Sequence, residues 1–193
     1  MQASFKCEEE DPLQHQFTMP QVPGPEGLES SNDFLQRQLD ENPDTMSEKE
    51  RKMIINMLKQ KFHVDKRPVD PELYHLRKQG EPKRYVWVRA QGNIGENLKL
   101  QQCVAGFISD IALLGAAMQP APTGHKVGFI TSLDHSMWFH NPFRADEWML
   151  YEIESPQCGK GKALSIGRMW RQDGVLAVSM AQEGVVRSHK SML

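Results

Sequence analysis

Three polar side chains in the second half of the 193-residue sequence stand out by their position. Asp110 borders the apolar face of a helical repeat, where a carboxylate must find hydrogen-bond donors or change its pKa. Gln182 shares one strand face with apolar neighbours, and it therefore points toward the expected core. Ser132 lies on a long extended segment. Groups of this kind also occur in purely structural networks, so these residues alone leave both a structural and a chemical interpretation open.

The segment from Ser132 to His140 also contains the residue types of a Ser-His-Asp nucleophilic set. Asp134 and His135 lie next to one another, and serines occupy positions 132 and 136. Neighbouring residues of a strand point to opposite faces, so groups this close in sequence cannot easily converge on one reacting atom. We therefore interpret Asp134, His135 and His140 as structural residues of a long, bent strand. No Cys/His cluster has metal-ligand spacing, and neither a metal nor a cofactor is expected.

The residues from Arg84 onward predict the elements that position these side chains. Apolar residues recur at helical spacing from Asn97 to Leu114, with Gly115 at the end, and predict a buried helix. Asp173-Gly174 is a hairpin signal between two strand-like segments. One long helix followed by antiparallel strands indicates an α+β domain in which a sheet wraps around a helix. The predicted strands cover residues 85–90, 127–139, 148–155, 163–171 and 175–186.

The first 83 residues have a different composition, since they contain eight of the 12 prolines. Such a segment is typical of a connector that wraps a surface. Ser47 to Glu50 has the pattern of a capping box, which predicts an amphipathic helix with Met53, Ile54 and Met57 on its apolar face. A shorter helix is expected over residues 32–39.

Composition excludes some classes of protein. The net charge of -2 argues against a nucleic-acid binder. We expect no stretch to approach a membrane span. The three cysteines are widely spaced and odd in number, which favours a reduced compartment over a disulfide framework. Cys103 falls in the helical apolar repeat, and we expect it in the core.

Several motifs resemble, in order, those of the thioesterase II-type acyl-CoA thioesterases, and the resemblance runs from about Met1 to the C-terminus, most densely from Tyr85 onward. The matching segments are residues 132–140 (SLDHSMWFH), 141–144 (NPFR), 171–176 (RQDGVL) and 181–184 (AQEG). The resemblance implies a hot-dog fold, which is a long central helix wrapped by an antiparallel sheet. It also implies hydrolysis of fatty acyl-CoA.

The resemblance assigns roles to the three polar residues. In the family an aspartate on the central helix, a serine or threonine before the Asp-His motif and a glutamine in the Gln-Glu-Gly motif together activate a water. These positions match Asp110, Ser132 and Gln182. Asp110 would accept the proton, and Ser132 and Gln182 would orient the water. A backbone amide near the helix start is a candidate donor to the developing oxyanion.

The family normally carries two hot-dogs, whereas this sequence predicts one. We expect a hot-dog domain over residues 84–187. The connector, residues 1–83, would begin with the remnant of a first domain's last strand. The open flank of a single hot-dog favours self-association by hot-dog pairing. The alternative to an enzyme is a catalytically inactive, truncated hot-dog that serves as a dimerising or acyl-binding module.

Residues 188–193 are expected to be a targeting tail. Their last three residues, Ser191-Met192-Leu193, are similar to the peroxisomal address Ser-Lys-Leu. Beside the resemblance to peroxisomal family members, this predicts the peroxisomal import receptor as a partner and the peroxisome as the location, with the cytosol as the fallback.

Overall fold

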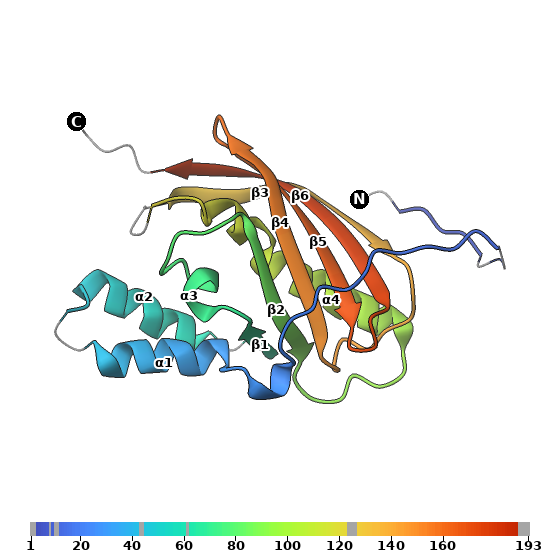
Figure 1. Cartoon of the computed structure of the whole chain (residues 1–193), viewed down its shortest axis with the longest axis horizontal. Coiled ribbons are helices and arrows are strands. Elements are labelled where there is room, and N and C mark those ends of the chain that lie inside the picture. Colours follow the sequence, from blue (N-terminus) through green and yellow to red (C-terminus); the bar gives the residue numbers. More distant parts are fainter. Residues whose placement is uncertain are drawn as a thin grey trace.

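A six-stranded antiparallel sheet curls around one long helix in the computed structural model, which describes residues 3–7, 9, 12–42, 45–60, 62–122 and 127–188 (Figure 1). The strand order is β1-β2-β4-β5-β6-β3. The helix is α4, and with the sheet it forms the predicted hot-dog architecture. The strands are β1 (Val64–Pro68), β2 (Lys83–Ala90), β3 (Val127–Phe139), β4 (Met149–Gly159), β5 (Lys162–Arg171) and β6 (Leu176–Ser188).

Helix α4 (Leu98–Ala112) begins where the sequence predicts, because the Asn97 side chain accepts hydrogen bonds from the Lys99 and Leu100 amides. Its inner face packs Ala105 and Ile108 against the sheet. The chain then continues as the 3₁₀ helix η2 (Leu113–Met118). Gly115 therefore does not end the helix but lies inside this 3₁₀ segment.

Residues Leu98–Met118 are long and apolar enough to cross a membrane by length and composition alone. On those criteria, the expectation that no stretch approaches a membrane span was wrong. The physical reason is that a helix enclosed by a sheet must itself be apolar, and half of this segment is buried.

The predicted hairpin between β5 and β6 is confirmed. The Gly174 amide donates to the Arg171 carbonyl at 3.0 Å, and Gly174 has φ of 86°. A side chain there would be strained, which explains the Asp-Gly pair. This turn sets the pairing in which Gln182 lies opposite Ser165 of β5.

The connector contains both predicted helices and three further elements. Its helices are α1 (Ser31–Glu41), α2 (Glu48–Lys59) and α3 (Pro71–Tyr74), after a 3₁₀ turn η1 (Pro25–Gly27). Ser47 accepts a hydrogen bond from the Glu50 amide at 3.3 Å, as the capping pattern predicts. Phe34, Leu35 and Ile54 form a small core between α1 and α2. Strand β1 pairs with β2, so the connector extends the sheet of the predicted domain.

The N-terminal part of the connector crosses the outer face of the sheet (Figure 1). The Gln16 amide donates to the Gly174 carbonyl at 2.8 Å, and its oxygen accepts from the Leu176 amide at 3.0 Å. Met19 and Val22 pack against the cluster that contains Trp170. The connector thus covers apolar surface that the sheet leaves on its outer side.

Two other apolar surfaces, one on β3 and one on α4, are exposed to solvent. Strand β3 is an edge strand, and Leu133 and Trp138 on it are 54% and 53% exposed. On α4, Phe107 is exposed, and so is Cys103, contrary to the expectation that this cysteine lies in the core. The helix is apolar on its outer side as well as on its inner side, so periodicity alone did not identify the buried face.

Candidate active site

Three different elements bring the sequence-predicted polar residues together. Asp110 comes from the last turn of α4, Ser132 from β3 and Gln182 from β6. Strands β3 and β6 pair directly, with Ser132 opposite Gly184, and the register shifts between Ser132 and Asp134. This irregularity lies beside the cluster, where bulges commonly redirect a side chain.

Gln182 connects the cluster. Its Nε2 donates to Asp110 Oδ1 at 2.7 Å and to Ser132 Oγ at 2.7 Å. The residue is 1% exposed, as expected for a side chain on the core face of β6. Both hydrogens of the amide are used in these bonds, so Gln182 holds the other two residues at a set separation.

Asp110 and Ser132 are the accessible members of the cluster. The Asp110 side chain is 65% exposed, and Ser132 is also exposed. Within the described residues no hydrogen bond reaches Asp110 Oδ2, and Ser132 keeps its own hydroxyl hydrogen while its oxygen accepts from Gln182. The cluster therefore presents one proton acceptor and one donor to an approaching ligand.

Gly184 explains the glycine of the Gln-Glu-Gly motif. A Cβ at this position would come within 2.9 Å of the Thr131 carbonyl oxygen and would also collide with Leu114. Glycine thus lets β3 and η2 approach β6 closely. That approach brings Ser132 within hydrogen-bond distance of Gln182.

His135 also lies beside the cluster, although we interpreted it as structural from the sequence. Ser109 Oγ lies 2.8 Å from the Gly106 carbonyl oxygen, to which its hydroxyl donates, and 3.1 Å from His135 Nε2. His135 Nδ1 then faces Asp110 Oδ1 at 3.8 Å. His135 reaches the cluster because it pairs with Gln182 across β3 and β6. No local sequence pattern specifies that pairing.

Two other polar residues, Asp134 of β3 and His140 directly after it, do not join this cluster. Asp134 accepts a hydrogen bond from the Glu183 amide at 3.3 Å. His140 Nε2 contacts Ser179 Oγ at 2.9 Å, and partial burial lowers the pKa of His140. These bonds tie β3 to β6. They agree with the inference that Asp134 and His140 do not form a nucleophilic set with Ser132 or Ser136.

Comparison with known proteins agrees with the fold and the motifs. The sequence profile of the acyl-CoA thioesterase family matches residues 57–185. Acyl-coenzyme A thioesterase 8 of Homo sapiens is 49% identical over 96% of this chain and 58% of its own length. Acyl-CoA thioesterase 2 of Haemophilus influenzae is 32% identical over 96% of this chain and 62% of its own length.

Solved structures show the same similarity. An acyl-CoA thioesterase II, TesB2, from Mycobacterium marinum superposes with a TM-score of 0.68 at 29% identity, and the match covers 94% of this chain and 60% of that one. A hot-dog protein of unknown function from Alicyclobacillus acidocaldarius gives a TM-score of 0.61 at 14% identity, which supports the fold alone.

The fold defines a single hot-dog, with a helical connector that adds a strand to its sheet. The profile match over most of the chain and the 49% identity then establish its relationship. The chain belongs to the acyl-CoA thioesterase family, and it spans about three fifths of the length of the curated relatives it matches.

Proposed function

We propose that the chain hydrolyses fatty acyl-CoA to a free fatty acid and CoA, with a water activated by Asp110, Ser132 and Gln182. The observation that carries this proposal is the pair of 2.7 Å hydrogen bonds by which Gln182 joins Asp110 to Ser132. Family membership supplies the substrate class. The division into a connector of residues 1–83 and a hot-dog of residues 84–187 is part of the same proposal.

The geometry modifies the roles expected from the resemblance. Both amide hydrogens of Gln182 are already donated and its Oε1 is buried, so this residue positions its neighbours and does not contact the water. The water donates one hydrogen bond to Asp110 Oδ2 and accepts one from the Ser132 hydroxyl. Its remaining lone pair can then face the thioester carbonyl carbon.

The proposed reaction has two steps. Asp110 takes a proton from the water as its oxygen bonds to the carbonyl carbon, which forms a tetrahedral intermediate. The intermediate then collapses, the carbon–sulfur bond breaks, and the CoA thiolate takes the proton from Asp110. A thiolate is a good leaving group, so no covalent enzyme intermediate is required.

The start of α4 cannot supply the oxyanion donor that the resemblance suggested. Asp110 lies twelve residues after Leu98, which places it about 18 Å along the helix axis at about 1.5 Å per residue. The Lys99 and Leu100 amides are also already capped by Asn97.

Release of CoA thiol tests the proposed activity. The purified chain is mixed with hexadecanoyl-CoA, and a thiol-reactive dye reports turnover. Thiol release that depends on Asp110 supports the enzyme. No release by the folded chain would favour the alternative of a dimerising or acyl-binding module, which the open β3 edge also suggests.

Self-association and a peroxisomal location are further parts of the proposal. The exposed edge strand β3, with Leu133 and Trp138 on it, supports pairing with a second hot-dog. The location depends on the tail at residues 188–193, of which residues 189–193 lie outside the described part of the chain. Recognition by the import receptor depends on the sequence similarity of Ser191-Met192-Leu193 to the peroxisomal address.

A further inference from the structure

We infer that the connector forms one wall of the acyl-chain site and thereby sets which acyl lengths fit. This inference rests on the proposed thioesterase function. It assigns a binding role to Met53, Met57 and Phe62, which belong to α2 and to the residues after it.

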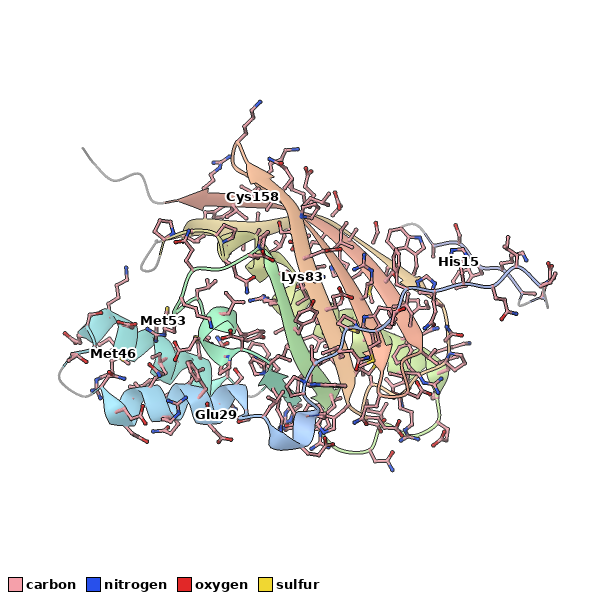
Figure 2. All side chains as sticks on the ribbon, in the orientation of Figure 1. His15, Glu29, Met46, Met53, Lys83 and Cys158 are labelled. Atoms are coloured by element: carbon pink, nitrogen blue, oxygen red, sulfur yellow. The ribbon has the colours of Figure 1, made fainter. Side chains whose placement is uncertain are left out.

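A groove of about 870 Å³ runs between the connector and the hot-dog. Met53, Met57 and Phe62 line it from the connector, and Figure 2 marks Met53 on α2. Phe107 and Ile130 line it from α4 and β3. The volume lies within the range of about 300–1,000 Å³ that is usual for small-molecule sites.

The proposed catalytic pair lies in the wall of this same groove, since Asp110 and Ser132 both line it. A bound thioester must place its carbonyl carbon near these two side chains. Its hydrocarbon chain must then leave the polar cluster along apolar surface. A polar point in the wall of an otherwise mainly apolar groove matches the chemistry of a fatty acyl thioester.

No described part of the chain covers the apolar lining. Met53, Met57, Phe62, Phe107 and Ile130 are each between 40% and 54% exposed. A groove in which five large apolar side chains are this exposed has room for an apolar ligand. The connector wall is nevertheless held in place, because Ile54 on the same helix is fully buried against Phe34.

The two walls also touch each other. The rings of Phe62 and Phe107 are 6.4 Å apart at a tilt of 42°. This contact joins the connector to α4 at the groove. The unbranched, flexible methionines beside it can adjust to chains of different length and shape.

A bulky residue on the connector wall tests the inference. Met57→Trp fills the groove, whereas Asn56→Trp adds the same side chain at an exposed neighbouring position that does not line it. Met53→Trp is a second filling variant in case Met57→Trp does not fold. We expect kcat/KM for hexadecanoyl-CoA to fall about 10-fold or more in the filling variants and to change by less than about 2-fold for butanoyl-CoA. Asn56→Trp should leave both values unchanged.

The outcomes separate the groove from the reaction. Equal effects on the two substrates, or none, would overturn the groove assignment, while Asp110-dependent turnover would leave the proposed function intact. If the filling variants instead change the oligomeric state measured by light scattering, the groove is a contact between copies and the assignment is wrong.

If the chain shows no thioesterase activity, binding of a fatty acid to the groove tests the inference instead. The probe is a dansyl-labelled undecanoic acid, whose fluorescence rises in apolar surroundings. Saturable binding that is lost in Met57→Trp and kept in Asn56→Trp would support the groove. Absence of saturable binding to the folded wild-type chain would reject it.

Discussion

At the scale of single residues, Gln182 organises the cluster although the proposed chemistry belongs to Asp110. Its amide lies in the core and reaches both neighbours at 2.7 Å. Its buried Oε1 has no hydrogen-bond partner among the described residues. A buried polar atom without a partner lowers stability, and such costs commonly occur at functional sites.

Replacing the proposed base should remove most of the activity. Asp110→Asn keeps the size of the side chain and can still accept the hydrogen bond from Gln182, so the fold should persist. An amide cannot take the proton of a water, and we expect turnover to fall by about 10²–10⁴-fold. Thiol release under saturating substrate measures this, with circular dichroism as the control for folding. Near-wild-type turnover by the folded variant would refute the assignment of Asp110.

The two positioning residues should act together. Ser132→Ala and Gln182→Ala should each cost less turnover than Asp110→Asn. The double variant should be less impaired than the product of the single effects, because Gln182 acts on the water through Ser132 and Asp110, which it holds in place. The coupling is measured from the kcat/KM values of the wild type, the two single variants and the double variant. If the two single effects simply multiply in the double variant, the residues do not share a role.

At the scale of elements, buried charge and aromatic packing join the connector to the hot-dog. Arg84 of β2 is buried, and it donates to the carbonyls of Tyr74 and Ala112. It thereby caps the C-terminal end of α4 with a positive charge, although burial lowers its pKa. The Arg84 guanidinium passes so close to Gly115 that a side chain there would collide with it. This contact explains why residue 115 is a glycine, which the sequence analysis had interpreted as the end of the helix.

His75 should make the stability of the connector depend on pH. Its ring stacks on Phe34 and contacts Ser31 Oγ at 3.0 Å, and burial, followed by nearby positive charges, lowers its pKa to about 4. The unfolded chain binds a proton here below about pH 6.5, whereas the folded chain does so only below about pH 4. The free energy of unfolding should therefore decrease as pH falls from about 6.5 to 4, by up to about 3 kcal/mol.

Denaturant unfolding at several pH values tests this. His75→Phe removes the titrating group and keeps a ring against Phe34, so the slope of stability against pH should flatten over that interval. The exposed His63→Gln serves as the control. An unchanged slope in His75→Phe would show that other groups cause the acid sensitivity.

At the scale of the whole molecule, the open flank of the hot-dog should pair with a second copy. Trp138→Lys places a charge on the exposed edge strand β3 and should shift the chain toward monomer. Phe5→Lys, at a residue that is 95% exposed elsewhere, is the matched control. Size-exclusion chromatography with light scattering measures the mass. A wild-type chain that is active as a monodisperse monomer would contradict the prediction.

The address is tested apart from the enzyme. A fluorescent protein that carries residues 184–193 should collect in punctate organelles together with a peroxisomal marker, and deletion of Leu193 should disperse it. A diffuse reporter with the intact tail would return the location to the cytosol and leave the proposed activity unaffected.

Local patterns in the sequence determined the elements of this protein. The capping pattern at Ser47, the helical apolar repeat after Asn97 and the Asp173-Gly174 turn act over a few residues, so they could be recognised without the fold. The three proposed site residues could be named because they lie in motifs shared with a family. Asp110 and Gln182 also interrupted patterns that are otherwise apolar.

Tertiary structure decided which of these local features meet. The register between β3 and β6 brings His135 and Ser132 to Gln182, and it depends on pairing between segments about fifty residues apart. Packing of α2 against its own small core places Met53 and Met57 at a groove across from α4. Both arrangements depend on contacts between distant segments, so periodicity within a segment carries no information about them. For the same reason the sequence did not reveal which apolar face of α4 the sheet covers.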